Sequence, residues 1–149
     1  MAEAGREAPG DDTHPVVAGS LATGLRGSKP LTTGGSPLDK LTRYREIIRR
    51  ELQGYADWLT KPDGRIRSEV VYHPTLDHFE LVYHGWEGNR RVHSVPFHPD
   101  IIDGKIWIQH DGTGRPIAIE LERSGVPKDD IVLGFHSAEN RVHIGYGVG

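Results

Sequence analysis

The chain contains no cysteine, and this absence excludes several kinds of chemistry at once. Without thiols there is no disulfide framework, no thiolate nucleophile and no zinc ribbon. No apolar run approaches the roughly 18 to 20 residues that span a bilayer, and the N-terminus lacks the apolar core of a signal peptide. We therefore expect a soluble, cytoplasmic protein.

An excess of positive charge is also missing, because the formal net charge is −3 and the pI is near 6.3. Proteins that bind DNA on their own usually present clustered Lys and Arg to the phosphates. Direct DNA binding is thus an alternative that we do not favour. It requires one set of arginines to gather on a single surface: Arg43, Arg49, Arg50, Arg90, Arg91 and Arg141.

Aromatic residues are absent from residues 1–37, which instead hold seven Gly and four Pro. A segment of this composition cannot bury enough apolar surface to offset the entropy lost on ordering. All eleven aromatics lie between Tyr44 and Tyr146. We expect residues 1–37 to be a disordered N-terminal extension and residues 38–149 to form one domain.

The first element of this domain is a predicted helix. Ser36, Pro37 and Asp39 form a start signal, with Ser as N-cap, Pro at the first helical position and an acidic residue three positions after the cap. Apolar residues then recur at helical spacing, so the helix should continue to Leu59 and bury one stripe. That stripe comprises Leu38, Leu41, Ile48, Leu52, Tyr55 and Leu59.

Alternating apolar and polar residues after the helix predict four main strands. They cover Ile66–His73, Phe79–Trp86, Arg90–His98 and Ile106–Gln109. A second helix is expected at Pro116–Ser124, followed by short extended pieces at Ile131–Phe135 and Val142–Val148. This order favours an α+β fold, an antiparallel β-meander with both helices packed on one face.

Histidine is the most promising residue type for chemistry, as a near-neutral acid or base and as a metal ligand. A two-residue turn at Gly88 and Asn89 pairs His84 with His93, but it places His98 opposite Phe79, on the other face. The group His84, His93, His98 and Asp100 is therefore split, and we predict no metal site. The remaining histidines near turns and strand ends are expected to be solvated: His73, His78, His110 and His143.

Other catalytic patterns are weak. There is no G-x-S-x-G, and Gly112-Thr113-Gly114 lacks the Lys-Ser/Thr of a phosphate loop. We interpret Thr113 as lying near the N-cap of the second helix and Asp111 as a cap or an acceptor of backbone hydrogen bonds. We therefore predict no catalytic residue and no cofactor.

Several short phrases follow one another along the chain: Leu38-Asp39-Lys40-Leu41, Asp77-His78-Phe79, Gly85-Trp86, Arg91-Val92-His93, Gly104 to Gln109, Asp111-Gly112-Thr113, Gly125-Val126-Pro127-Lys128 and Asp130 to His136. In this order they resemble the XisI family, the fdxN element excision controlling factors. The resemblance covers residues 38–149 and implies a small α+β domain without established catalytic residues. It also implies control of the excision of a DNA element by a site-specific recombinase. Members of this family are commonly encoded beside XisH-like proteins.

We accordingly expect an accessory factor that acts through contacts with an XisH-like partner, within a possible recombinase complex. The edges of a small open sheet also make a homo-oligomer credible. A possible functional surface comprises His98, Asp100, Gln109, Asp111, Thr113, His136 and Arg141. The enzyme alternative is a metal-dependent nuclease, or a nuclease cofactor, and it requires His98, Asp100, Asp111 and His136 to converge in one cleft.

Overall fold

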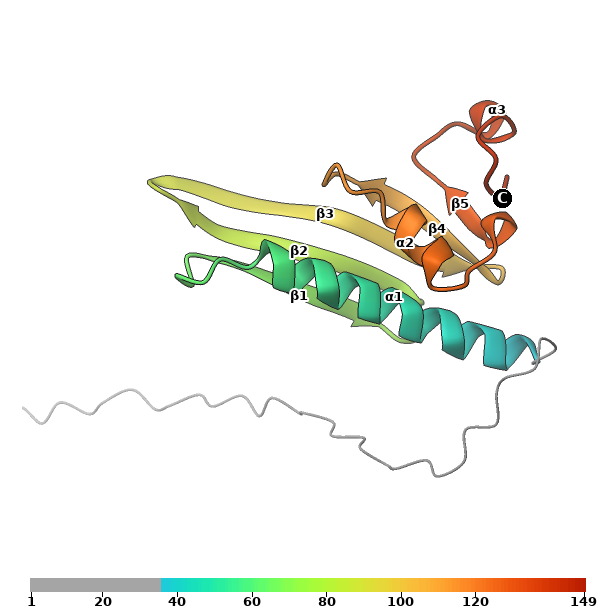
Figure 1. Cartoon of the computed structure of the whole chain (residues 1–149), viewed down its shortest axis with the longest axis horizontal. Coiled ribbons are helices and arrows are strands. Elements are labelled where there is room, and N and C mark those ends of the chain that lie inside the picture. Colours follow the sequence, from blue (N-terminus) through green and yellow to red (C-terminus); the bar gives the residue numbers. More distant parts are fainter. Residues whose placement is uncertain (1–35) are drawn as a thin grey trace, which may run out of the picture. The chain divides into compact units, whose positions relative to one another are not determined.

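The structure, a computed structural model, describes residues 36–149 (Figure 1). The expected N-terminal extension lies almost wholly outside the described residues. In chain order the elements are α1 (Pro37–Leu59), β1 (Ile66–His73), β2 (His78–Glu87), β3 (Arg90–Ile102), β4 (Lys105–Asp111), α2 (Ile117–Arg123), the 3-10 turn η1 (Lys128–Asp130), β5 (Ile131–Leu133) and α3 (Ala138–Arg141). Among these residues, no helix is both long enough and apolar enough to cross a membrane.

Helix α1 begins and ends where the sequence predicts. The Ser36 hydroxyl accepts a hydrogen bond from the Asp39 N–H, and the Asp39 carboxylate accepts one from the Ser36 N–H, each at 3.3 Å. One member of the predicted stripe is wrong, because the Leu38 side chain is 73% exposed. Leu38 lies in the first turn, ahead of the buried residues. The buried face comprises Tyr44, Ile47, Ile48, Leu52, Tyr55 and Ala56.

Five strands form one sheet in the order β1-β2-β3-β4-β5. The first four are an antiparallel meander as predicted, and α1 and α2 share one apolar core against the sheet, so the α+β prediction is confirmed. Strand β5 pairs in parallel with β4, because the connection through α2 and η1 returns the chain in the direction of β4.

The C-terminal prediction is wrong, since Val142–Val148 is not an extended strand. Ser137 accepts a hydrogen bond from the Asn140 N–H and starts the short helix α3 instead. In the residues that follow, the only strand-like pairing is the bridge between Val132 and Gly147. Backbone hydrogen bonds from the His143 and Ile144 N–H groups to the Asn140 and Arg141 carbonyls continue the turn beyond α3, so the segment does not extend.

Two irregularities in β3 determine which side chains share a face. The hairpin register is as predicted near its turn, where His84 lies opposite His93. A shift between Leu81 and Tyr83 then changes the pairing by one residue, so that Leu81 lies opposite Phe97. The expectation that His98 lies opposite Phe79, apart from the other histidines, is therefore wrong. The bulge returns His98 to the face of His84 and His93, because a one-residue shift exchanges the two faces of a strand.

Asp130 joins the start of α1 to η1, and this link gives a testable dependence on pH. The carboxylate accepts a hydrogen bond from the Tyr44 hydroxyl and lies 2.8 Å from the Lys40 ammonium. Burial alone raises the pKa of Asp130, but the hydrogen bonds from Lys40 and Tyr44 outweigh it, and the net pKa is lowered. Because the pKa of Asp130 is lower in the folded state than in the unfolded state, the ionised carboxylate stabilises the fold at pH values above the unfolded-state pKa. This stabilisation is lost as the pH falls through the folded-state pKa.

Replacing Asp130 by Asn is expected to reduce the free energy of unfolding at pH 7 by about 1–2 kcal/mol, because charge-assisted hydrogen bonds are lost. The difference from the unmodified chain should shrink as the pH falls below about 4, where that chain loses the same contribution. Urea unfolding at pH 7 and pH 3 measures both effects. Asp129→Asn, at an exposed neighbour, is the control. An equal loss at both pH values would show that the charge of Asp130 is irrelevant.

Candidate functional site on the open face of the sheet

The sheet has one face without α1 and α2, which we call the open face. Strand alternation directs the side chains of Phe97, Ile106 and Ile108 towards the helices, where they are fully buried. The alternate residues of β2, β3 and β4 point to the open face. Of the seven residues predicted as a functional surface, three from β3 and β4 lie there: His98, Asp100 and Gln109.

Three side chains of the open face converge on a common point. The Nδ1 atom of His78 lies 2.7 Å from Oδ1 of Asp100, and Nε2 of His98 lies 3.1 Å from His78 Nδ1 and 3.3 Å from Asp100 Oδ1. The two imidazole rings meet edge to face with centroids 4.5 Å apart. These side chains remain partly accessible, at 31%, 29% and 16% exposure for His78, His98 and Asp100.

Two further polar groups hold this cluster in place. The Oε1 atom of Glu80 lies 3.2 Å from Nε2 of His78, and the Gln109 amide donates a hydrogen bond to Oδ2 of Asp100 at 3.3 Å. Burial lowers the pKa of His78, but its hydrogen bonds to Asp100 and Glu80 outweigh this effect and the net pKa is raised. Positive charge on His78 is therefore favoured.

The C-terminal segment borders the open face beside β4 and β5. The Arg141 guanidinium lies 5.1 Å from the centroid of the Trp107 ring and donates hydrogen bonds to the carbonyls of His136 and Val148, at 2.8 and 2.9 Å. Trp107 pairs with Asp100 across the strands. Trp107 therefore lies between the polar cluster and Arg141, which places Arg141 and the His136 carbonyl near that cluster. The His136 ring itself packs against Phe135, at a centroid distance of 4.6 Å.

Asp111 and Thr113 are not part of this surface. Asp111 pairs with Phe97, a residue of the helix-covered side, and its Oδ2 accepts a hydrogen bond from the Ile117 N–H at 2.9 Å. Asp111 therefore accepts a backbone hydrogen bond at the start of α2, the second of the two roles predicted for it, while the Thr113 hydroxyl bonds to the Arg115 backbone. Burial raises the pKa of Asp111 more than its backbone hydrogen bonds lower it.

This placement removes the geometry that the nuclease alternative requires. His98 and Asp100 meet on the open face, but Asp111 lies on the opposite side of the sheet and the His136 ring packs on Phe135. The four residues do not form one cleft.

The six arginines of the DNA-binding alternative lie in three separate regions of the fold. Arg43, Arg49 and Arg50 are on α1, where Arg43 donates to the Gly125 carbonyl and Arg50 pairs with Glu51. The pair at Arg90 and Arg91 is at the turn of the β2–β3 hairpin, and Arg141 is at the C-terminal segment. They do not form the single basic surface on which DNA binding depends.

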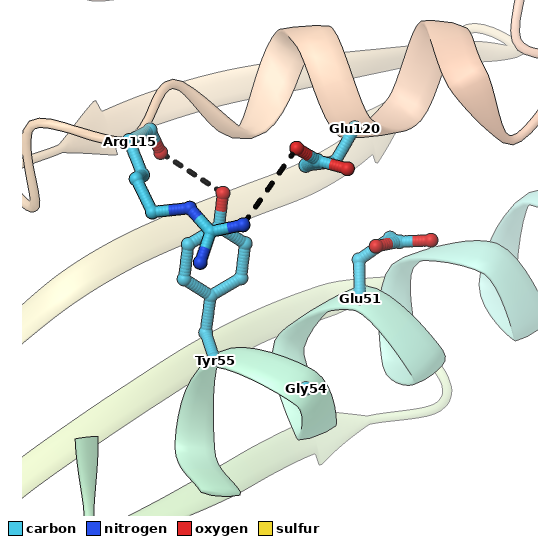
Figure 2. Close-up of a pocket in the computed structure, with 5 residues that line it drawn as sticks. All are labelled: Glu51, Gly54, Tyr55, Arg115 and Glu120. Atoms are coloured by element: carbon cyan, nitrogen blue, oxygen red, sulfur yellow. Dashed lines mark hydrogen bonds and ion pairs between the residues drawn. The ribbon is translucent and has the colours of Figure 1, made fainter. Parts of the chain in front are cut away.

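A small hollow of about 170 Å³ lies between α1 and α2, as Figure 2 shows. The Tyr55 hydroxyl donates to the Arg115 carbonyl at 2.9 Å, and the Arg115 guanidinium lies 4.0 Å from Glu120. Burial raises the pKa of Tyr55 to about 12. Glu51 and Gly54 complete the lining. These groups tie the two helices together.

Sequence reasoning missed His78 and Glu80 because it placed His78 at a turn and used an unbroken register. A signal was available in the prolines of β3, at Pro96 and Pro99. Proline cannot donate to the hydrogen-bond ladder, so in a central strand it marks a bulge or another irregularity. Both register shifts of β3 lie beside these prolines.

Comparisons with known proteins agree on one relationship. The family model described as XisI protein matches residues 38–148. A crystal structure of an XisI-like protein from Anabaena variabilis ATCC 29413 is 35% identical, with a TM-score of 0.67, and the match covers 73% of this chain and 99% of that one. A second crystal structure, of the fdxN element excision controlling factor XisI from the same organism, is 31% identical with a TM-score of 0.63, covering 74% and 100%. No curated protein matches significantly.

Proposed function

Because the chain belongs to the XisI family, we propose that it is a non-catalytic accessory factor that controls the excision of a DNA element by a site-specific recombinase. The observation that carries this proposal is the match to a protein described as an excision controlling factor. The match covers the whole of that protein at 31% identity. The dispersed positions of the candidate nuclease residues also favour a regulatory role over a catalytic one.

We propose that this control works through protein contacts on the open face, with an XisH-like protein as the partner. The open face carries exposed apolar side chains: Val71 and Ile102, at 44% and 40% exposure, lie near the polar cluster, and Trp86, at 51%, lies towards the β2–β3 turn. Aromatic and aliphatic anchors among polar groups are typical of protein interfaces. The outer surface of α1 instead carries mixed charges such as the Arg50 and Glu51 pair.

Co-expression of the full chain with an XisH-like protein from the same genome, followed by size-exclusion chromatography with mass detection, tests this proposal. Co-elution at a fixed stoichiometry is expected, and separate elution would contradict it. The mass of the chain alone tests whether it forms a homo-oligomer, for which β1 offers a sheet edge beyond the hydrogen bonds that Ile66 and Ser68 make to Lys61 and Thr60.

A matched pair of substitutions tests which face binds. Ile102 on the open face and Ile119 on α2 are almost equally exposed, at 40% and 42%. Ile102→Arg should weaken the complex at least about tenfold, because an unpaired charge would be buried at an anchor position. Ile119→Arg should leave the affinity within about twofold. The opposite order would move the interface to the helical side.

A further inference from the structure

The His78, His98 and Asp100 cluster has the dimensions of a coordination site. Its three donor atoms form a closed triangle with edges of 2.7, 3.1 and 3.3 Å. Ligands at about 2.0–2.2 Å from a zinc-like ion lie roughly 3.0–3.5 Å from one another. One ion can therefore contact all three atoms with shifts of a few tenths of an ångström.

Two neighbouring side chains, Glu80 and Gln109, orient the three donor atoms for binding a metal ion. Glu80 faces Nε2 of His78, and an acceptor there keeps the hydrogen on Nε2 and leaves the lone pair of Nδ1 directed at the cluster. Gln109 binds Oδ2 of Asp100, and Oδ1 faces both histidines, at 2.7 Å from His78 Nδ1 and 3.3 Å from His98 Nε2, which also lies 3.3 Å from Oδ2. A carboxylate on the distal nitrogen of a ligating histidine is the usual outer contact of metal sites.

A hydrogen bond joins His78 to Asp100, but Nε2 of His98 is less well placed, 3.1 Å from His78 Nδ1 and 3.3 Å from Asp100 Oδ1. If both nitrogens carry hydrogens, two N–H groups converge 3.1 Å apart. If either nitrogen carries none, its lone pair faces the carboxylate, at 2.7 Å for His78 and 3.3 Å for His98. A divalent cation at the centre resolves both conflicts, because all three atoms then act as acceptors.

We propose that His78 Nδ1, His98 Nε2 and Asp100 Oδ1 bind one divalent transition-metal ion of the zinc class. Two imidazoles and one carboxylate suit zinc and its neighbours, whereas Mg²⁺ and Ca²⁺ prefer oxygen ligands. Three protein ligands leave a fourth position, which faces solvent because the side chains are 16% to 31% exposed. That position is available to water or to a donor group of another molecule.

The donors also lie on rigid elements. His78 is the first residue of β2, and His98 and Asp100 are alternate residues of β3 that share one face. A site built on paired strands keeps its geometry better than one built on loops. This inference does not depend on the identity of any protein partner.

Titration of the untagged, chelator-treated full chain with Zn²⁺, followed by calorimetry, tests the proposal, and the absorption spectrum with Co²⁺ reports the ligand set. We expect one ion per chain. His98→Ala and the nearly isosteric Asp100→Asn should each weaken binding at least about tenfold, and Glu80→Gln should weaken it about tenfold through the outer contact. Circular dichroism establishes whether each variant is folded. If His98→Ala is unfolded, Asp100→Asn still tests the site.

His93→Ala and His143→Ala are the matched controls, since they remove exposed histidines outside the cluster. Both should bind Zn²⁺ within about twofold of the unmodified chain. The proposal is overturned if the chain binds no Zn²⁺ at millimolar concentration, or if either control weakens binding as much as His98→Ala does.

Discussion

Replacing Gly85 by alanine is expected to reduce the free energy of unfolding by about 3–5 kcal/mol. Gly85 is buried in β2 with φ of +148°, a backbone conformation that L side chains rarely adopt. An added Cβ would clash with the carbonyl oxygen of Arg65 and lie only 2.7 Å from the Cα of Ile66. Both contacts are with backbone atoms at the start of β1, so no side-chain rotation relieves them.

Chemical denaturation with a fluorescence readout measures this effect. The matched control is Gly88→Ala at the hairpin turn, where φ is +63° but no atom lies within 4 Å of an added Cβ. This control isolates the conformational cost, and it should lose only about 1 kcal/mol. A Gly85→Ala variant as stable as the Gly88→Ala variant would show that β1 can move away from β2 at little cost.

Phe97→Ala should have an effect of similar size, about 3–5 kcal/mol, because it leaves a cavity in the core. Phe97 is fully buried, pairs with Leu81 across the β2–β3 shift and lies 4.4 Å from Tyr55 of α1 between ring centroids. It therefore joins the sheet to the longest helix. The melting temperature should fall by roughly 10–25 °C, as measured by calorimetry.

Trp86→Ala is the control for the loss of a large aromatic side chain. Trp86 is 51% exposed on the open face, and its main contact is the Arg91 guanidinium at 5.6 Å from the ring. Its removal should cost no more than about 1 kcal/mol. Equal losses in the two variants would contradict the assignment of the core to the helix-covered side of the sheet.

Zinc titration of the Phe97→Ala variant tests whether the proposed metal site depends on the core beneath β3. Phe97 directly precedes His98, and the register shift places Phe97 in the core and His98 on the open face. If this variant still folds, a loosened β3 should weaken Zn²⁺ binding although no ligand is removed. Unchanged affinity would show that the site is independent of the core beneath it.

The local elements of this protein are determined by its sequence. The Ser36 capping box, the apolar period of α1 and the alternation of the first four strands depend on neighbours a few residues away. The structure confirms the capping box and the four strands, and it confirms the stripe of α1 except at Leu38. The hairpin register near Gly88 follows for the same reason, since a two-residue turn determines which residues pair. The relationship to the XisI family is likewise detectable from the sequence alone.

The arrangement of the candidate site is decided only by the tertiary structure. A register shift in β3 reverses the face of His98 and brings it to His78, and the parallel strand β5 leads into the C-terminal segment that carries Arg141 to Trp107. These features result from competition between ladder hydrogen bonds, the prolines of β3 and the packing of Phe97 against α1. Because that competition involves segments far apart in the chain, periodicity and local signals cannot resolve it.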